Sequence, residues 1–147
     1  MNIRPFPMKL LVVVMFGCVD AAIPNKTDFS TIFGSKPISC FQVTFSEYHL
    51  PEVRVSLFAE CPDGDVMELQ LKVIQNPDNV FTVDTADAKT KAHYDEFINL
   101  SKPRCYDIVK MQEGDMKKIT YRVLKGFEVV ETSIGGIQRQ LTPGRCI

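Results

Sequence analysis

From Ser39 onward the chain alternates between apolar and polar residues over short stretches, a pattern typical of strands with one buried face. Turn-forming sequences separate the stretches, among them Cys61-Pro62-Asp63-Gly64-Asp65 and Asn76-Pro77-Asp78-Asn79. The pattern predicts seven or eight strands, over residues 39–46, 52–60, 67–73, 80–83, 98–100, 119–123, 127–129 and 137–141. We therefore expect an all-β fold, in the form of an antiparallel β-sandwich with at most one short helix.

One segment, residues 84–100, fits two descriptions. Thr85 or Asp87 can cap a helix whose apolar spacing reaches Tyr94 and beyond. The end of the segment also alternates as a strand would, which places Asn99 on the solvent side. We expect a loop or short helix to about Tyr94 and then a strand over 98–100, and the pattern leaves open whether 85–97 is helix or loop.

The first residues have the form of a secretory signal peptide. Arg4 and Lys9 precede an apolar run over 10–16, which is too short to span a bilayer, and small residues follow at Ala21 and Ala22. We expect cleavage after Ala21, which makes 1–21 the signal peptide. The segment Pro24–Lys36 is polar on the whole, so we expect 22–37 to form a flexible N-terminal arm and 38–147 to form the folded domain. The product is expected to be secreted and free of a transmembrane anchor.

Removal of the signal peptide changes the cysteine count from five to four, because Cys18 leaves with it. Cys40, Cys61, Cys105 and Cys146 remain, and an even number in a short secreted chain indicates two disulfides with three possible connectivities. We expect the pairs Cys40–Cys61 and Cys105–Cys146. A zinc site is not indicated, because the four cysteines form no Cys-x-x-Cys pair.

The strand register bears on the first of these pairs. If 39–46 and 52–60 form a hairpin with matched apolar faces, Phe41 lies opposite Ala59 and Cys40 lies opposite Glu60. Cys61 is then one residue too far and on the other face of the sheet. A Cys40–Cys61 bridge consequently needs a β-bulge, or a Cys61 that has already left the strand.

Two Asn-x-Ser/Thr sequences fit the same compartment. They begin at Asn25 and at Asn99, and each is a candidate for N-linked glycosylation in a secreted protein. Both side chains are therefore expected to lie on exposed surface.

Composition and charge exclude several partners. The chain has 147 residues, 45% of them hydrophobic, and a net charge of −1, so a compact core is expected and nucleic acid is not a predicted partner. Asp63 and Asp65 could contact a calcium ion, but a solvated turn explains them better because further oxygen ligands are missing. No cofactor is indicated.

Catalytic residues are also not indicated. His49 and His93 are isolated, the common hydrolase and nucleotide-binding motifs are missing, and bridged cysteines provide no thiolate. The sequence therefore predicts a protein that is not an enzyme.

The strand order and spacing resemble those of the nematode transthyretin-like family over roughly residues 38–147. The resemblance is carried by four segments: Pro51-Glu52-Val53-Arg54-Val55-Ser56-Leu57-Phe58, Asn76-Pro77-Asp78-Asn79-Val80-Phe81-Thr82-Val83, Ile98-Asn99-Leu100 before Cys105-Tyr106-Asp107, and Ser133-Ile134-Gly135-Gly136-Ile137 before Arg145-Cys146-Ile147. It implies a transthyretin-type β-sandwich and an extracellular protein without enzymatic activity. The hydrolase branch of that fold looks to end in Tyr-Arg-Gly-Ser, whereas this chain ends Pro143-Gly144-Arg145-Cys146-Ile147.

These features together predict a secreted binding or adaptor module whose partner is an extracellular protein or a cell-surface ligand. An extracellular carrier of a small apolar ligand is the alternative, and a hydrolase is a second one. No motif in the sequence specifies the oligomeric state or the identity of the partner.

Overall fold

The computed structural model describes residues 27–35, 38–49 and 52–146, without the side chains of 47–49. The expected signal peptide over 1–21 and the sequon at Asn25 lie outside the described residues.

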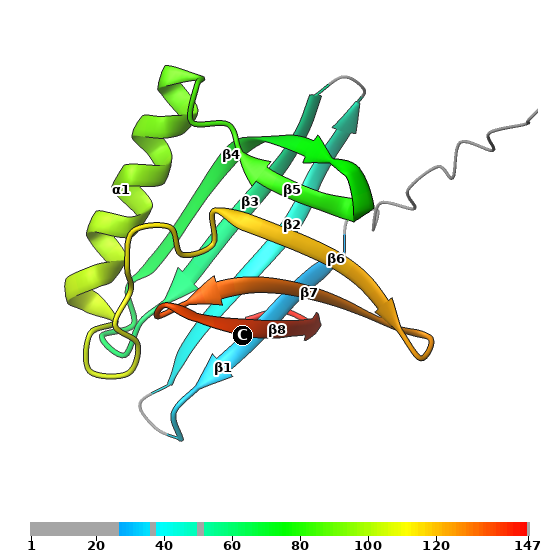
Figure 1. The fold of residues 1–147 in the computed structure, drawn as a ribbon. Helices are drawn as coiled ribbons and strands as arrows, with labels where there is room; N and C mark the ends of the chain where they lie inside the picture. The colour runs from blue at the N-terminus through cyan, green and yellow to red at the C-terminus, as the bar shows by residue number, and fades with distance from the viewer. Residues whose placement is uncertain (1–26, 36–37, 50–51, 147) are drawn as a thin grey trace, which may run out of the picture.

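The described strands form one antiparallel sheet that closes into a barrel, in which each strand pairs with the next and the last pairs with the first (Figure 1). The all-β prediction is confirmed, and the two-sheet sandwich is not, because the sheet is continuous around the core. The elements are β1 (Asp28–Phe33), β2 (Ser39–His49), β3 (Glu52–Glu60), β4 (Val66–Asn76), the 3-10 helix η1 (Pro77–Asn79), β5 (Val80–Val83), α1 (Ala88–Arg104), β6 (Lys118–Leu124), β7 (Phe127–Ile134) and β8 (Ile137–Pro143).

Strand β1 lies inside the segment expected to be a flexible arm, so the expectation for 22–37 is wrong over Asp28–Phe33. The strand pairs with β2 over its whole length, from Asp28 opposite Thr44 to Phe33 opposite Ser39. Phe29 is fully buried and supplies the apolar contact that fixes the strand. The folded domain therefore begins before residue 38.

Apolar side chains fill the inside of the barrel. The inward residues of every strand join one cluster, and its aromatic rings meet edge to face, as Phe45 does with Phe29 and with Phe81. Phe29, Phe41, Phe81, Leu57, Leu71, Ile119 and Leu141 are completely buried in it. In a small eight-stranded barrel such side chains occupy the space that a ligand fills in larger ones.

Helix α1 completes the wall where the sheet is short. Only Val73–Asn76 of β4 pair with β5, and α1 packs against β4 beside the rest of that strand. The Asp87 side chain caps the helix by accepting a hydrogen bond from the Thr90 backbone N–H at 2.8 Å. One stripe of the helix is buried against the barrel: Thr90, Tyr94, Phe97, Ile98 and Ser101.

The strand expected over 98–100 is wrong, because α1 continues through it to Arg104. Ile98 and Leu100 alternate as strand residues do, but Leu100 is exposed, while Phe97, Ile98 and Ser101 extend the helical stripe. Asn99 faces solvent from the helix, as the sequon prediction requires, although from a different element.

The two disulfides are present, but the expected connectivity is wrong. Cys40 pairs with Cys146 and Cys61 pairs with Cys105. The hairpin register itself is confirmed, with Phe41 opposite Ala59 and Cys40 opposite Glu60. Cys61 joins the buried core cluster, whereas Cys40 shares the outer face with exposed Ile32, so the two sulfurs lie on opposite sides of the wall.

Among the described residues, none of the helices has the length and apolar character that crossing a bilayer requires.

Candidate functional site

The barrel is incomplete at the seam between β1 and β8. These strands pair at only two positions, Phe29 with Pro143 and Ser30 with Thr142, whereas β1 and β2 pair over six. Beyond Ser30 the strands diverge toward the end of the barrel where α1 ends (Figure 1). Residues 31–33 of β1 and 137–141 of β8 therefore face one another without a ladder of hydrogen bonds between them.

Hydrogen bonds and an ion pair around Asp28 stabilise the paired end of this seam. The Asp28 carboxylate accepts hydrogen bonds from Thr44 Oγ1 at 2.6 Å and Gln42 Nε2 at 3.3 Å, and forms an ion pair with Arg145. Burial opposes ionisation of Asp28, but the hydrogen bonds from Arg145 and Thr44 outweigh it and lower the pKa. The Cys40–Cys146 bridge passes beside this cluster and joins the chain beyond β8 to β2.

A groove of about 290 Å³ lies at the diverging end of the seam. We call it the seam groove. Its walls come from the end of β1, the start of β8, the turn before β8 and the segment that follows α1. The lining residues are Phe33, Tyr106, Asp107, Ile108, Val109, Lys110, Ile134, Gly135, Ile137 and Arg139.

Two cations of the groove are held over aromatic rings. Lys110 Nζ lies 5.3 Å from the centre of the Tyr106 ring, and the Arg139 guanidinium carbon lies 5.2 Å from the centre of the Phe33 ring. Neither cation forms an ion pair within the described part of the chain, and Arg139 Nε, which is shielded from solvent, has no hydrogen-bond acceptor there. Asp107 is the one acidic residue among the lining residues.

Buried Asp115 fixes the turn that forms one side of the groove. Its carboxylate accepts hydrogen bonds from Ser133 Oγ at 2.6 Å and from the backbone N–H groups of Gln112, Gly135 and Gly136 at 2.8, 2.8 and 3.0 Å. Both glycines have positive φ, 67° and 72°, so the turn relies on their conformational freedom. This hydrogen-bonded anchor keeps the segment after α1 against the β7–β8 turn.

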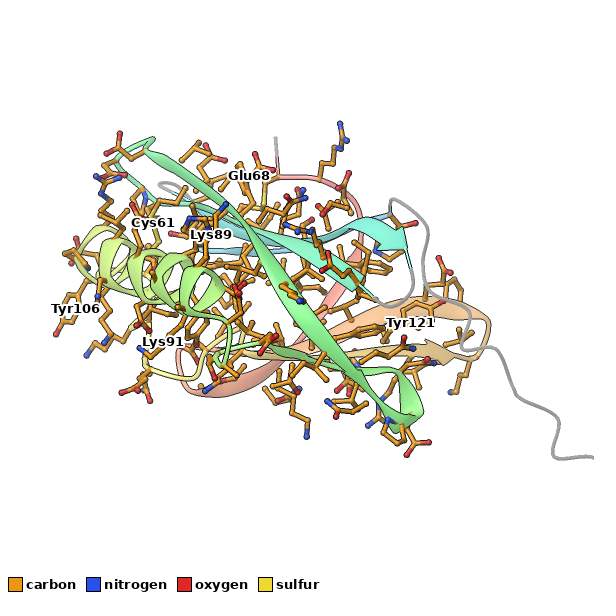
Figure 2. The ribbon with its side chains drawn as sticks, turned by 90° about the horizontal axis from the view of Figure 1, so that it is seen from above. Cys61, Glu68, Lys89, Lys91, Tyr106 and Tyr121 are labelled. Atoms are coloured by element: carbon orange, nitrogen blue, oxygen red, sulfur yellow. A yellow bond between two sulfur atoms is a disulfide. The ribbon has the colours of Figure 1, made fainter. Side chains whose placement is uncertain are left out.

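Two lining residues of the seam groove, Tyr106 and Ile137, form its exposed rim, and each is 56% exposed. Figure 2 shows Tyr106 directed outward at the end of the molecule where α1 ends, while Tyr121 lies toward the opposite end. Groove and rim together form one surface of mixed apolar and polar side chains, with two cations that have no ion-pair partner among the described residues.

A second exposed apolar set is formed by Val123, Leu124 and Phe127 at the tip of the β6–β7 hairpin, which projects from the barrel in Figure 1. Here Arg122 is already paired with Glu131 at 3.0 Å. The cation beside the tip is thus already paired, unlike the two cations of the seam groove.

Sequence-predicted candidates lie elsewhere. His93 is half-buried on α1 and lines a polar groove between α1 and strands β3 and β4, and His49 ends β2, with its side chain outside the described atoms. Asp65 pairs with Arg104 at 3.1 Å, and Asp63 accepts a hydrogen bond from the Asp65 backbone N–H at 3.0 Å, as in a polar turn. Within the described ranges, His, Cys, Asp and Glu side chains do not gather in threes as metal ligands would.

Sequence reasoning missed the seam groove, because its residues come from three distant segments of the chain. Phe33 and Ile137 alternate with their neighbours as barrel residues do, and their exposure depends on how far β1 and β8 separate. Only the run Tyr106–Lys110, which follows a cysteine directly and mixes aromatic, charged and apolar residues, could have drawn attention to one wall.

No family model matches the chain, and neither a curated protein nor a solved structure matches it.

Proposed function

We propose that the protein is a secreted extracellular binding module without catalytic activity, and that the surface around the seam groove binds its partner. The observation that supports this most directly is the concave surface of apolar and charged side chains at the β1–β8 seam, with two cations that have no acidic partner within the described residues. The partner is an extracellular protein or a cell-surface ligand.

The composition of this surface favours a protein partner. Interface centres are enriched in aromatic residues and Arg, and Phe33, Tyr106 and Arg139 bring such side chains around a pocket. A stable interface covers roughly 800 Å² on each partner, which is more than the groove alone provides. Tyr106 and Ile137, both more than half exposed, leave apolar area open to a partner at the groove.

Secretion is supported by the two disulfides, since such bridges persist in oxidising compartments. The sequon at Asn99 faces solvent, which is the arrangement that an attached glycan needs. We keep both the secreted location and the glycan at Asn99 as parts of the proposal. Membership of the transthyretin-like family implied a two-layer sandwich, and the closed barrel lends it no support.

The second candidate function is a carrier of a small apolar ligand. The apolar groove floor favours it, because Val109 and Ile134 are buried side chains at the base of a hollow of about 290 Å³. The packed barrel interior weighs against a ligand inside the sheet. Native mass spectrometry of the protein secreted by its own cells separates the functions, since a carrier retains a small molecule in a fixed ratio.

Comparative capture from extracellular fluid tests the proposed function. Ile137→Ser removes an exposed apolar side chain from the rim, and Ile74→Ser removes one of similar exposure, 50%, from β4. We expect a protein partner to be captured by the wild-type protein and by Ile74→Ser, and to be lost with Ile137→Ser. Equal capture by both variants would contradict a role for this surface.

A further inference from the structure

We infer that the seam groove recognises a carboxylate carried next to an apolar side chain on an extended segment of the partner protein. This inference rests on the proposed function and specifies the chemistry of its partner.

The two cations point to an anion. A cation over a ring is held in place by the electron-rich face of the ring, while its N–H groups stay free to donate to another group. Lys110 and Arg139 are both held in this way, and neither has a carboxylate partner in the described part of the chain. An incoming carboxylate would accept hydrogen bonds from both, and Arg can bind it through two parallel donors.

The charge of the groove fits a carboxylate better than a doubly charged phosphate. Lys110 and Arg139 contribute two positive charges and Asp107 contributes one negative charge, which leaves one positive charge among the lining residues. A single negative charge therefore neutralises the groove. A phosphate dianion would leave an excess of negative charge beside Asp107.

The floor of the groove fits an apolar side chain. Val109 and Ile134 are buried, Ile108 packs against the core, and the hollow holds about 290 Å³. Since one water occupies about 30 Å³ in the liquid, this is the space of about ten waters. One leucine-sized or phenylalanine-sized side chain with a neighbouring carboxylate fits into that space.

A protein segment fits this surface more completely than a free small acid. A small acid within the groove leaves much of exposed Tyr106 and Ile137 in water, whereas a chain that continues past the groove covers them. Residues 31–33 and 137–141 also present strand edges that do not pair with each other. An extended segment can form backbone hydrogen bonds with such an edge.

The charge preference can be measured by NMR titration of the intact secreted protein. The probes are N-acetylphenylalanine, which has a carboxylate beside an aromatic ring, and N-acetylphenylalaninamide, its neutral counterpart. We expect the acid to bind at least five-fold more tightly, with amide shifts at residues around the groove, and the preference to disappear in a Lys110→Gln/Arg139→Gln protein. Arg139→Lys should keep part of the preference, and Lys89→Gln, on α1, should keep all of it.

Equal affinity for acid and amide, or a preference that survives the double substitution, would overturn the inference. Capture from extracellular fluid then separates its failure from that of the proposed function. If Ile137→Ser loses the partner and Lys110→Gln/Arg139→Gln retains it, the carboxylate inference fails and the binding surface stands. If Ile137→Ser retains the partner, the proposed function itself fails. A small acid found in a fixed ratio in the secreted protein would replace the protein segment as the occupant.

Discussion

Removal of the Cys40–Cys146 bridge should lower stability strongly, because this bridge closes the weakest seam of the barrel. The variant is Cys40→Ser/Cys146→Ser, which leaves no unpaired thiol from the bridge. The bridged residues are 106 apart in sequence, and the Cys61–Cys105 bridge already closes 44 of that span, which leaves about 62 residues. The loop-entropy relation for a loop of this length gives about 4 kcal/mol at 25 °C.

A loss of about 4 kcal/mol is a large part of the 5–15 kcal/mol typical of a small domain, and it corresponds to a fall in Tm of about 15 °C. Urea unfolding of the wild-type protein and the variant, followed by circular dichroism, measures the difference. Amide hydrogen exchange should locate it. β1 and β8, which share two paired positions, should exchange faster in the variant, while the longer β2–β3 ladder stays protected.

An unfolding free energy within 1 kcal/mol of wild type would refute this reasoning, as would accelerated exchange that spares β1 and β8. The variant Cys61→Ser/Cys105→Ser is the control, because it removes a disulfide at a different place in the barrel. Those cysteines lie in the core cluster, so their loss should disturb the contact of α1 with the barrel and leave the β1–β8 pairing intact.

Three further outcomes are expected. Asp115→Asn should lower the free energy of unfolding by about 2–3 kcal/mol in urea titration, since an amide donor replaces one oxygen of a buried side chain that accepts four hydrogen bonds, and a change under 0.5 kcal/mol would contradict this. Because the folded pKa of Asp28 is lowered, its stabilisation is complete above its ordinary pKa of 3.8 and disappears as pH falls through the lowered value; Asp28→Asn should therefore destabilise the protein at pH 7, and this effect should shrink steadily as the pH falls below 3.8. Burial and the hydrogen bond to Glu128 raise the pKa of Tyr121 to about 12, and Glu128→Gln should move the ultraviolet titration back toward 10.

The local alternation of apolar and polar residues predicted most strands. It did not predict which strands distant in sequence pair with each other. The register of β2 with β3 follows from matching apolar faces, and the structure has it as expected. The same register placed Cys40 and Cys61 on opposite faces, so the pairing that we expected needed a β-bulge or a Cys61 that had already left the strand. Only closure of the barrel, which brings the chain after β8 across β1 to β2, shows why Cys40 meets Cys146.

The missed helix and the missed strand have local causes. Ile98 and Leu100 satisfy a strand pattern over three residues, and only the longer helical stripe through Ser101 decides between the two. β1 was hidden because polar residues surround Phe29, so the average composition of 22–37 concealed an alternation between Phe29 and Phe33. In both cases, the periodic pattern becomes clear only when residue positions are compared over a longer stretch of sequence.

The seam groove could not be predicted from any single stretch of the sequence. Its aromatic rings, cations and apolar floor come from β1, the segment after α1, and β8, and they meet only because β1 and β8 pair at two positions and then separate. The width of that separation depends on packing around the whole barrel, and no short motif specifies it.

Photo-cross-linking from the rim of the groove tests the central claim most directly. A photoreactive amino acid replaces Ile137 in one protein and Ile74 in another. Both isoleucines are exposed, but Ile137 lines the seam groove, whereas Ile74 lies on β4 and is not among the lining residues. After exposure to the extracellular fluid of the source and illumination, the products are identified by mass spectrometry. The account predicts one protein partner that is linked from position 137 and not from position 74, whereas equal labelling from both positions, or a partner linked only from position 74, would contradict it.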